Sequence, residues 1–255
     1  MGPRRCIKTD RAAAAKSIIT VFAMKKFFIT GGTGYMGTRL IKQLLKNNNH
    51  VTALVRKGSE QKIPAGAEVV IGNPFDAKTF QFFIPKDAIF IQLLGVAHPS
   101  PKKVQQFRDI DLKSVKASAD AATAACVSHF IYVSVAMAPS KLMHAYQEVR
   151  KEGEVYCREK KLQCTFIRPW YVLGPGHWWP VLLLPIYGVA ELNASWRTKS
   201  RSMALVTIRQ MIKALEYAAV SEPQSLQILE IKDIRNISSK KSEDMKTLSQ
   251  KPSYL

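Results

Sequence analysis

Three glycines at a spacing of three residues, Gly31, Gly34 and Gly37, constrain the fold of this chain more than any other feature. They lie between a short apolar run at 27–30 and a segment, 36–45, whose apolar residues recur at helical spacing. In a strand–turn–helix unit the first glycine permits the tight turn, the second keeps the backbone open, and the third lets the helix pack closely. The helix then begins with free N–H groups and a positive dipole end, which together bind phosphate groups.

The rest of the chain alternates between strand-like and helix-like segments. We expect strands at 27–30, 51–55, 68–71, 89–94, 130–133, 164–167 and 227–231, and further helices at 76–82, 101–126, 145–160 and 207–220. Strands separated by helices pair in parallel through right-handed crossovers, and near-continuous apolar strands are typical of a sheet covered on both faces. The sequence therefore predicts an α/β fold with a doubly wound parallel Rossmann sheet of about seven strands.

The length suits one main domain with a small appended lobe. We expect the dinucleotide-binding domain over 25–235, with a small C-terminal substrate lobe mainly from the Pro-, Gly- and Trp-rich residues 170–206. Residues 1–24 are expected to form a disordered or transit-peptide-like extension, or else Met24 is the biological start. Residues 236–255 are expected to form a disordered tail.

The formal net charge of +19 first suggests a nucleic acid or an anionic surface as partner. About half of that excess falls in the two terminal segments, and the central body has no long basic run. We therefore expect no nucleic-acid partner, although the charge keeps one as a third hypothesis. The longest apolar run, 178–190, contains two prolines and is shorter than the ~20 residues of a membrane span. A cytoplasmic protein is expected, or an organellar one if the extension is a transit peptide.

The four cysteines show no spacing typical of a metal site, and no histidine lies at ligand spacing from them. We expect no metal. Cys126, Cys157 and Cys164 have apolar neighbours and are expected to be small buried residues in a reducing compartment.

The residues after the second expected strand bear on which dinucleotide binds. An NAD site usually has Asp or Glu there, about 20 residues after the glycines, to bind the ribose 2′-hydroxyl. Here Arg56 follows the strand and no acid appears before Glu60. Because Arg pairs bidentately with a 2′-phosphate that a carboxylate would repel, we expect NADP rather than NAD. The alternative is that Arg56 is a solvated residue at a strand end.

Five segments resemble the atypical branch of the short-chain dehydrogenase/reductase superfamily, that is, its NmrA-like and NAD(P)H-binding, epimerase-like proteins. They read ITGGTGYMG at 29–37, LVR at 54–56, GNPFD at 72–76, YVSV at 132–135 and RPWYVLGPG at 168–176. The resemblance covers about residues 25–235 and implies a seven-stranded parallel Rossmann sheet with a small C-terminal substrate lobe.

The resemblance also implies which residues contact the cofactor. Those expected on the pyrophosphate are Gly31, Thr33, Gly34, Tyr35, Met36 and Gly37. Asn73 and Pro74 are expected near the adenine, Leu94, Gly95 and Val96 near the ribose and nicotinamide, and Pro169 and Val172 beside the carboxamide.

In the reductive chemistry of this superfamily a Tyr protonates the substrate carbonyl, a Ser binds that carbonyl, and a Lys lowers the Tyr pKa. The resemblance places Ser134 and Tyr146 in the first two roles, while Arg150 stands where the Lys is expected. Tyr146 and Arg150 share a helical face, but Arg is bulkier and does not donate a proton at neutral pH. Tyr146 is therefore either a catalytic acid or a partly buried aromatic residue.

Two functions follow from these observations. The first is an NADP(H)-dependent oxidoreductase for a small, apolar carbonyl or quinone, with Tyr146 or an ordered water as the proton source. The second, favoured by the lost lysine, is a non-catalytic NADP(H)-binding protein with a redox-sensing, regulatory or assembly role. The residues expected to line an apolar substrate cleft are His177, Trp178, Trp179, Leu182–Leu184, Tyr187 and Trp196. The sequence leaves the oligomeric state open.

Overall fold

A seven-stranded parallel sheet forms the centre of the protein, in the order β3-β2-β1-β4-β5-β6-β9. The computed structural model describes residues 24–138, 140, 143–176 and 204–239. The strands are β1 (Lys26–Thr30), β2 (His50–Val55), β3 (Glu68–Ile71), β4 (Ile89–Gln92), β5 (His129–Val133), β6 (Cys164–Ile167) and β9 (Leu226–Leu229). All neighbouring strands pair in parallel, which confirms the predicted doubly wound α/β fold.

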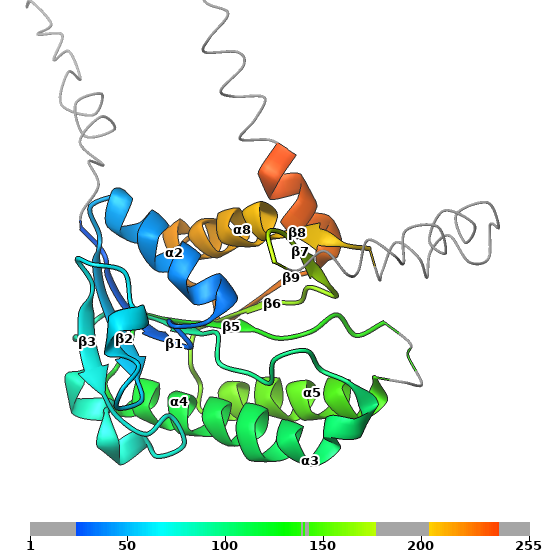
Figure 1. Cartoon of the computed structure of the whole chain (residues 1–255), viewed down its shortest axis with the longest axis horizontal. Helices are drawn as coiled ribbons and strands as arrows, with labels where there is room; N and C mark the ends of the chain where they lie inside the picture. Colours follow the sequence, from blue (N-terminus) through cyan, green and yellow to red (C-terminus); the bar gives the residue numbers. More distant parts are fainter. Residues whose placement is uncertain (1–23, 139, 141–142, 177–203, 240–255) are drawn as a thin grey trace, which may run out of the picture.

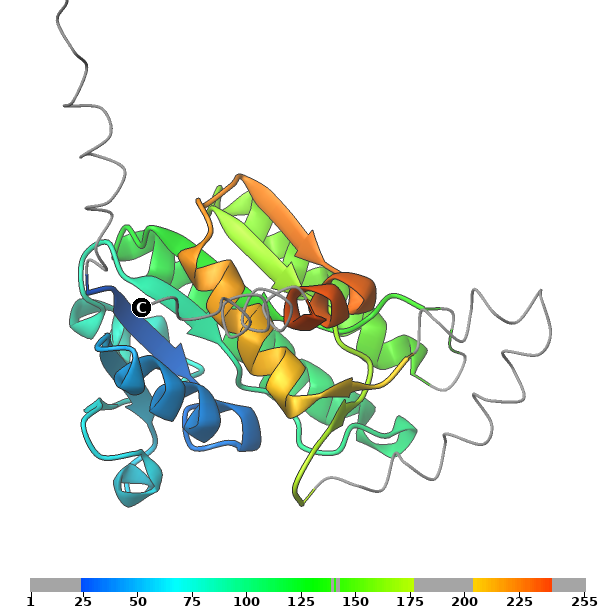
Figure 2. The ribbon, with the colours of Figure 1, turned by 90° about the horizontal axis from the view of Figure 1, so that it is seen from above.

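Helices cover both faces of this sheet, so its central strands are apolar on both sides (Figure 1). On one face lie α2 (Tyr35–Lys46) and α8 (Ile208–Val220), which Figure 2 shows from above. On the other face lie α4 (Lys113–Ala124) and α5 (His144–Glu159), with the short α3 (Val104–Gln106) preceding α4.

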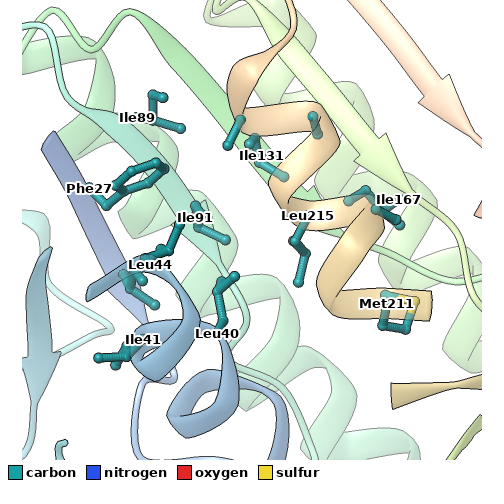
Figure 3. Close-up of a cluster of buried hydrophobic side chains, with 14 of the residues drawn as sticks. Phe27, Leu40, Ile41, Leu44, Ile89, Ile91, Ile131, Ile167, Met211 and Leu215 are labelled. Carbon is teal, nitrogen blue, oxygen red and sulfur yellow. The ribbon is translucent and has the colours of Figure 1, made fainter. Parts of the chain in front are cut away.

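Each face of the sheet has its own hydrophobic core. In Figure 3 the apolar side chains of α2 and α8, including Leu40, Leu44 and Leu215, point at Ile91 and Ile131 of the central strands. On the opposite face, phenylalanines at the same register stack across the sheet. The ring centroids of Phe90 and Phe130 are 5.2 Å apart, for example. Burial of these side chains supplies most of the folding free energy.

The strand order reverses direction at β1, which lies between β2 and β4. The chain winds outward to β3 on one side and returns to β4 on the other. Loops from the carboxyl ends of β1 and β4 diverge at such a point and leave a crevice where ligands bind in open α/β sheets. The glycine-rich turn after β1 opens on this crevice.

Several boundaries differ from the sequence-based expectations. β4 ends at Gln92 rather than at residue 94, because the chain bends there to pass close to the glycine turn. The helix expected at 101–126 is interrupted by η5 (Phe107–Leu112), a stretch of π-helix. The short helix expected after Asp76 is instead two 3-10 turns, η2 (Ala77–Thr79) and η3 (Gln81–Phe83).

The C-terminal boundary also lies later than expected. Residues 231–239 are helical, whereas the sequence predicts a tail from residue 236. Ile231 and Ile234 of this helix are buried, and Ile237 packs against the same core. Its apolar spacing therefore extends the ordered domain past 235.

The segment expected to form the substrate lobe lies mostly outside the described residues. Only its two ends are placed, where β7 (Val172–Leu173) pairs in parallel with β8 (Val206–Thr207). The expected cleft residues, His177, Trp178, Trp179, Leu182–Leu184, Tyr187 and Trp196, all lie outside the described residues. Within the described ranges, no helix has both the length and the apolar character to cross a membrane.

Two of the three cysteines among the described residues are buried as expected. Cys157 and Cys164 have no exposed surface, and burial raises the pKa of Cys164 to about 12. Cys126 is exposed, so that expectation was wrong. It follows the end of α4 in a left-handed turn (φ 50°), which turns it away from the apolar helix face.

We expect the stability of the fold to depend on pH through His129, at the start of β5. The side chain is 1% exposed, and its Nε2 lies 2.8 Å from Thr165 Oγ1. Burial, helped by the nearby charge of Lys25, lowers the His129 pKa from 6.5 to about 4. The unfolded state therefore binds a proton more readily than the folded state. Protonation of His129 lowers the free energy of unfolding progressively as pH falls from 6.5 to 4, and it has no effect above 6.5.

The size of this effect is about 3 kcal/mol in the free energy of unfolding, at about 1.4 kcal/mol for each pKa unit. Urea unfolding of the wild type and His129→Gln between pH 7.5 and 4 would measure it. The substitution should flatten the curve in that window. Parallel curves for the two proteins would contradict this origin of the pH dependence.

Candidate functional site

The three spaced glycines, two in the turn between β1 and α2 and one in the first turn of α2, have three different surroundings. Gly31 has a positive φ of 74°, and a Cβ there would lie 2.7 Å from the backbone N of Leu94. A Cβ on Gly37 would overlap the Gly31 carbonyl and lie 2.7 Å from Gly32 Cα. At Gly34 a Cβ would meet only the Gly31 carbonyl, at 3.2 Å. The first and third glycines therefore serve packing, and the second leaves open space beside the backbone.

The start of α2 carries no side chain that competes for its N–H groups. Gly34 is the N-cap residue, no side-chain hydrogen bond caps the helix, and the first turn has no acidic residue. Because the first N–H groups of a helix have no intrahelical acceptor, they are available to an anion together with the helix dipole. The bare helix start and the open Gly34 fit a diphosphate.

A cavity of about 420 Å³ opens at this point, over the carboxyl ends of β1, β2 and β4. Eight residues expected on the cofactor line it: Gly31, Thr33, Gly34, Arg56, Pro74, Leu94, Gly95 and Val96. They come from four loops that are distant in sequence and follow four adjacent strands of the sheet. The space and the donors at its wall fit a dinucleotide.

The remaining expected cofactor residues do not line the cavity. Met36 packs against the hydrophobic core, and Gly37 packs against the turn. Tyr35 stacks with Arg39, whose guanidinium lies 4.1 Å from the ring centroid. Asn73 caps its own turn through a hydrogen bond from Phe75 N to Oδ1, 3.1 Å.

Sequence reasoning missed about half of the lining. The additional residues are Leu54, Val55, Ser59, Phe75, Leu93, Ala97, Lys103, Gln106 and Ile110. Strand-end positions such as Val55 and Leu93 were predictable from the rule that strand carboxyl ends build the site. Lys103, Gln106 and Ile110 come from the helical segment after the β4 loop, and no local pattern marks them.

Arg56 gives the β2 side of the cavity a positive charge. Its side chain is exposed and lines the cavity, and within the described part of the chain no Asp or Glu lines it. Glu60 is the nearest acid in sequence. Hydrogen bonds from the backbone N–H groups of Glu60 and Gly58 lower the pKa of the Glu60 carboxyl group. The Glu60 carboxylate therefore stays ionised and is bonded to the backbone of its own turn.

Ser134 and Pro169 follow neighbouring strands at the carboxyl edge of the sheet. Ser134 N donates to Ile167 O at 2.8 Å, and Ala136 N donates to Pro169 O at 2.9 Å. Ser134 is 4% exposed, and its Oγ has no hydrogen-bond partner among the described residues. Buried hydroxyls are usually hydrogen-bonded, so this Oγ is an exception in the fold. Neither residue lines the cavity described above.

Tyr146 and Arg150 lie together on the buried face of α5. Tyr146 is 8% exposed, its ring packs on Phe107 with centroids 4.8 Å apart, and the Arg150 guanidinium lies 5.0 Å from its centroid. Burial raises the Tyr146 pKa despite the nearby Arg150, which makes the hydroxyl a weaker acid. Tyr146 is not among the cavity-lining residues.

Arg150 forms a buried ion pair with Asp111, a residue that sequence analysis did not single out. The same guanidinium donates to Val133 O at 3.1 Å and to Tyr132 Oη at 3.2 Å. Burial raises the Asp111 pKa, and the Arg150 charge opposes that shift. With its charge matched by Asp111, Arg150 acts less on the Tyr146 pKa than an unpaired cation would.

Comparison with known proteins agrees with this geometry. A family model described as NAD(P)H-binding matches residues 31–174, from the first glycine to the end of β7. The chain belongs to this NAD(P)H-binding family. The match covers the glycine turn, Arg56, the β4 loop and α5, and it confirms the predicted resemblance to NAD(P)H-binding proteins.

The relatives of this NAD(P)H-binding protein include enzymes. It is 23% identical over 209 residues to the ceramide reductase of Caulobacter vibrioides, covering 81% of this chain and 64% of the length of that reductase. Its fold is similar to Bordetella bronchiseptica WbmH, solved with NAD+, at TM-score 0.61 and 17% identity over 90% of this chain and 84% of WbmH. MoeE5, solved with UDP-glucuronic acid and NAD, is similar at TM-score 0.62 and 14% identity over 81% and 76% of the two chains.

Proposed function

We propose that the protein is an NADP(H)-dependent oxidoreductase that acts on a small, apolar carbonyl compound or quinone. One observation carries the proposal: the described residues that line the cavity beside the bare start of α2 include two cationic side chains, Arg56 and Lys103, and no carboxylate. That charge pattern suits a dinucleotide with an additional phosphate on its adenosine ribose. The likeness to a protein named ceramide reductase supports a reduction and an apolar substrate.

The described residues divide into three roles. The amides at the start of α2, with Thr33 and Gly34, would hold the diphosphate, and Arg56 would pair with the 2′-phosphate. Leu94, Gly95 and Val96 would contact the ribose on the nicotinamide side. A bound nicotinamide ring would supply two-electron reduction chemistry at the carboxyl edge of the sheet.

The proton for a reduced carbonyl oxygen is better provided by an ordered water than by Tyr146. The buried Tyr146 hydroxyl lies outside the cavity lining, and its raised pKa weakens it as an acid. Ser134 also lies outside the cavity lining, and what supports the role that the resemblance gives it is a buried Oγ without a hydrogen-bond partner among the described residues, which would be free to donate to a carbonyl oxygen or a water.

We expect Arg56→Asp to weaken NADPH binding about 100-fold, because it replaces a charge-assisted pair worth roughly 1.5–3 kcal/mol by repulsion. The NADH affinity should change less than about threefold, since NADH has no 2′-phosphate. Fluorescence titration with both coenzymes measures this. Lys57→Asp is the matched control, because Lys57 is exposed next to Arg56 and does not line the cavity. Equal affinity for both coenzymes, unchanged by Arg56→Asp, would refute the preference for NADP.

A second candidate function is a non-catalytic NADP(H)-binding sensor or assembly factor. The specific observation that favours it is the Asp111–Arg150 ion pair, which occupies the catalytic lysine position with a structural contact. NADPH oxidation against a panel of enones, quinones and long-chain ketones separates the two. Turnover of any panel member supports the enzyme, while tight NADPH binding without turnover supports the sensor.

A further inference from the structure

We propose that Asp111 is a positioning residue: together with Arg150 it holds the Gly95–Val96 backbone in the geometry that binds the nicotinamide half of the dinucleotide. The inference rests on the proposed cofactor site and assigns a role to a buried acid outside the motifs. It follows from where Asp111 lies, what it contacts, and how the β4 loop is placed relative to Arg56.

Asp111 is held in place through both its carboxylate and its backbone carbonyl. Its side chain has no exposed surface, pairs with Arg150, and accepts from Val96 N, with both oxygens 3.3 Å from that nitrogen. Its backbone carbonyl accepts from Ser114 Oγ at 3.0 Å, and Ser114 Oγ accepts from Gln92 Nε2 at 3.1 Å. From η5, Asp111 thus contacts the β4 loop and α5 directly, and it is linked to β4 through Ser114.

The π-helical geometry of η5 places this carboxylate beside the loop. Asp111 is the fifth residue of η5 (Phe107–Leu112), and it is buried on the side that faces Val96. A π-helical stretch inside an α-helix shifts the register of the following side chains and is frequent at functional sites. Ser114 Oγ satisfies the Asp111 carbonyl within this irregular turn.

The Asp111–Arg150 pair also lies directly behind Gly95. A Cβ on Gly95 would overlap an Arg150 guanidinium nitrogen and lie 2.7 Å from Asp111 Oδ1. The Cα of Gly95 therefore rests against the ion pair, while Gly95 itself lines the cavity. One side of this backbone faces the clamp formed by Asp111 and Arg150, and the other faces the cavity.

The sheet order indicates which half of the ligand this loop meets. Because β1 lies between β2 and β4, the loops after β2 and β4 lie on opposite sides of the glycine turn. With the adenosine 2′-phosphate at Arg56 and the diphosphate at the turn, the Gly95–Val96 backbone faces the nicotinamide half. A displaced β4 loop would weaken the binding of the nicotinamide half and leave the binding of the adenosine half unaffected.

The test compares NADPH with adenosine 2′,5′-bisphosphate, which carries only the adenosine half. We expect Asp111→Asn to weaken NADPH binding about tenfold or more and to leave adenosine 2′,5′-bisphosphate within about twofold. Gly95→Ala, which adds a methyl group on the clamp side, should give the same pattern without changing any charge. It keeps the test decisive if the buried Asp111→Asn variant folds poorly.

Glu154→Gln is the matched control. It breaks another buried ion pair of α5, with Arg168, that does not touch the β4 loop. It should lower the melting temperature and leave the affinity for both ligands unchanged. Equal weakening of both ligands by Asp111→Asn and Gly95→Ala, or no weakening of either, would overturn the positioning role. If the wild type prefers NADH, the NADP proposal fails, and NADH with 5′-AMP gives the same test of the clamp.

Discussion

Replacement of Gly34 by valine should abolish binding of both NADPH and NADH while the protein still folds. The Gly34 backbone has φ −79° and ψ 175°, which any residue adopts, and a Cβ there meets only the Gly31 carbonyl at 3.2 Å. A valine side chain would occupy the space beside the first N–H groups of α2. Loss of two charge-assisted hydrogen bonds, at roughly 1.5–3 kcal/mol each, predicts an affinity lower by at least about 100-fold.

The unfolding free energy should fall by only about 1 kcal/mol, the usual cost of a poor N-cap residue. Gly37→Ala is the informative contrast, because its methyl group would collide with the turn backbone. That variant should lose about 3 kcal/mol of stability through overpacking. Isothermal titration with each coenzyme and urea unfolding separate the two effects. If Gly34→Val binds either coenzyme normally, the diphosphate is not held at the start of α2.

The largest effect on stability should come from Arg150→Met. Removal of one partner of a buried ion pair leaves the other charge uncompensated, which costs about 3–5 kcal/mol. Here the remaining charge is Asp111, which has no exposed surface. Arg108→Met, in an exposed ion pair with Glu152, should cost less than about 1 kcal/mol. Urea unfolding of both variants measures the difference.

The pH dependence of the Arg150→Met variant identifies the mechanism. Without Arg150, only the backbone hydrogen bonds to Asp111 still oppose the effect of burial, so its folded-state pKa rises further above the ordinary value of 3.8. A group with a raised folded-state pKa stabilises the fold at low pH, and that contribution is lost as pH rises through the folded-state value. The gap between the variant and wild type should therefore widen from pH 5 to pH 8. A constant gap would mean that lost packing, and not the unpaired carboxylate, is responsible.

Much of the fold was predictable because its determinants are local. The apolar runs that become β1, β2, β5 and β6 are continuous in sequence, and the strand bounds differ from the expected ones by at most one residue. The three asparagines after α2 were predictable in the same way, since Asn47 is its C-cap and Asn48 has a positive φ of 56°. The π-helical interruption was not predictable, because the residues of 101–126 keep helical spacing throughout.

The candidate site was predictable in part. The glycine turn and Arg56 could be found from sequence because each follows directly after an expected strand. The roles of Tyr146 and Arg150 could not be settled in the same way. Their spacing was compatible with a catalytic pair, while the structure buries Tyr146 against Phe107 and pairs Arg150 with a carboxylate.

The sequence by itself determined the strand–glycine–helix unit, the parallel sheet and the cationic end of β2, since backbone conformation and apolar periodicity depend on neighbours in the chain. Only the tertiary structure decided which charges are paired. Asp111 and Arg150 are 39 positions apart in the sequence and meet because η5 packs on α5 over the same face of the sheet. The free energy of a buried charge depends on that packing, and no local pattern contains it.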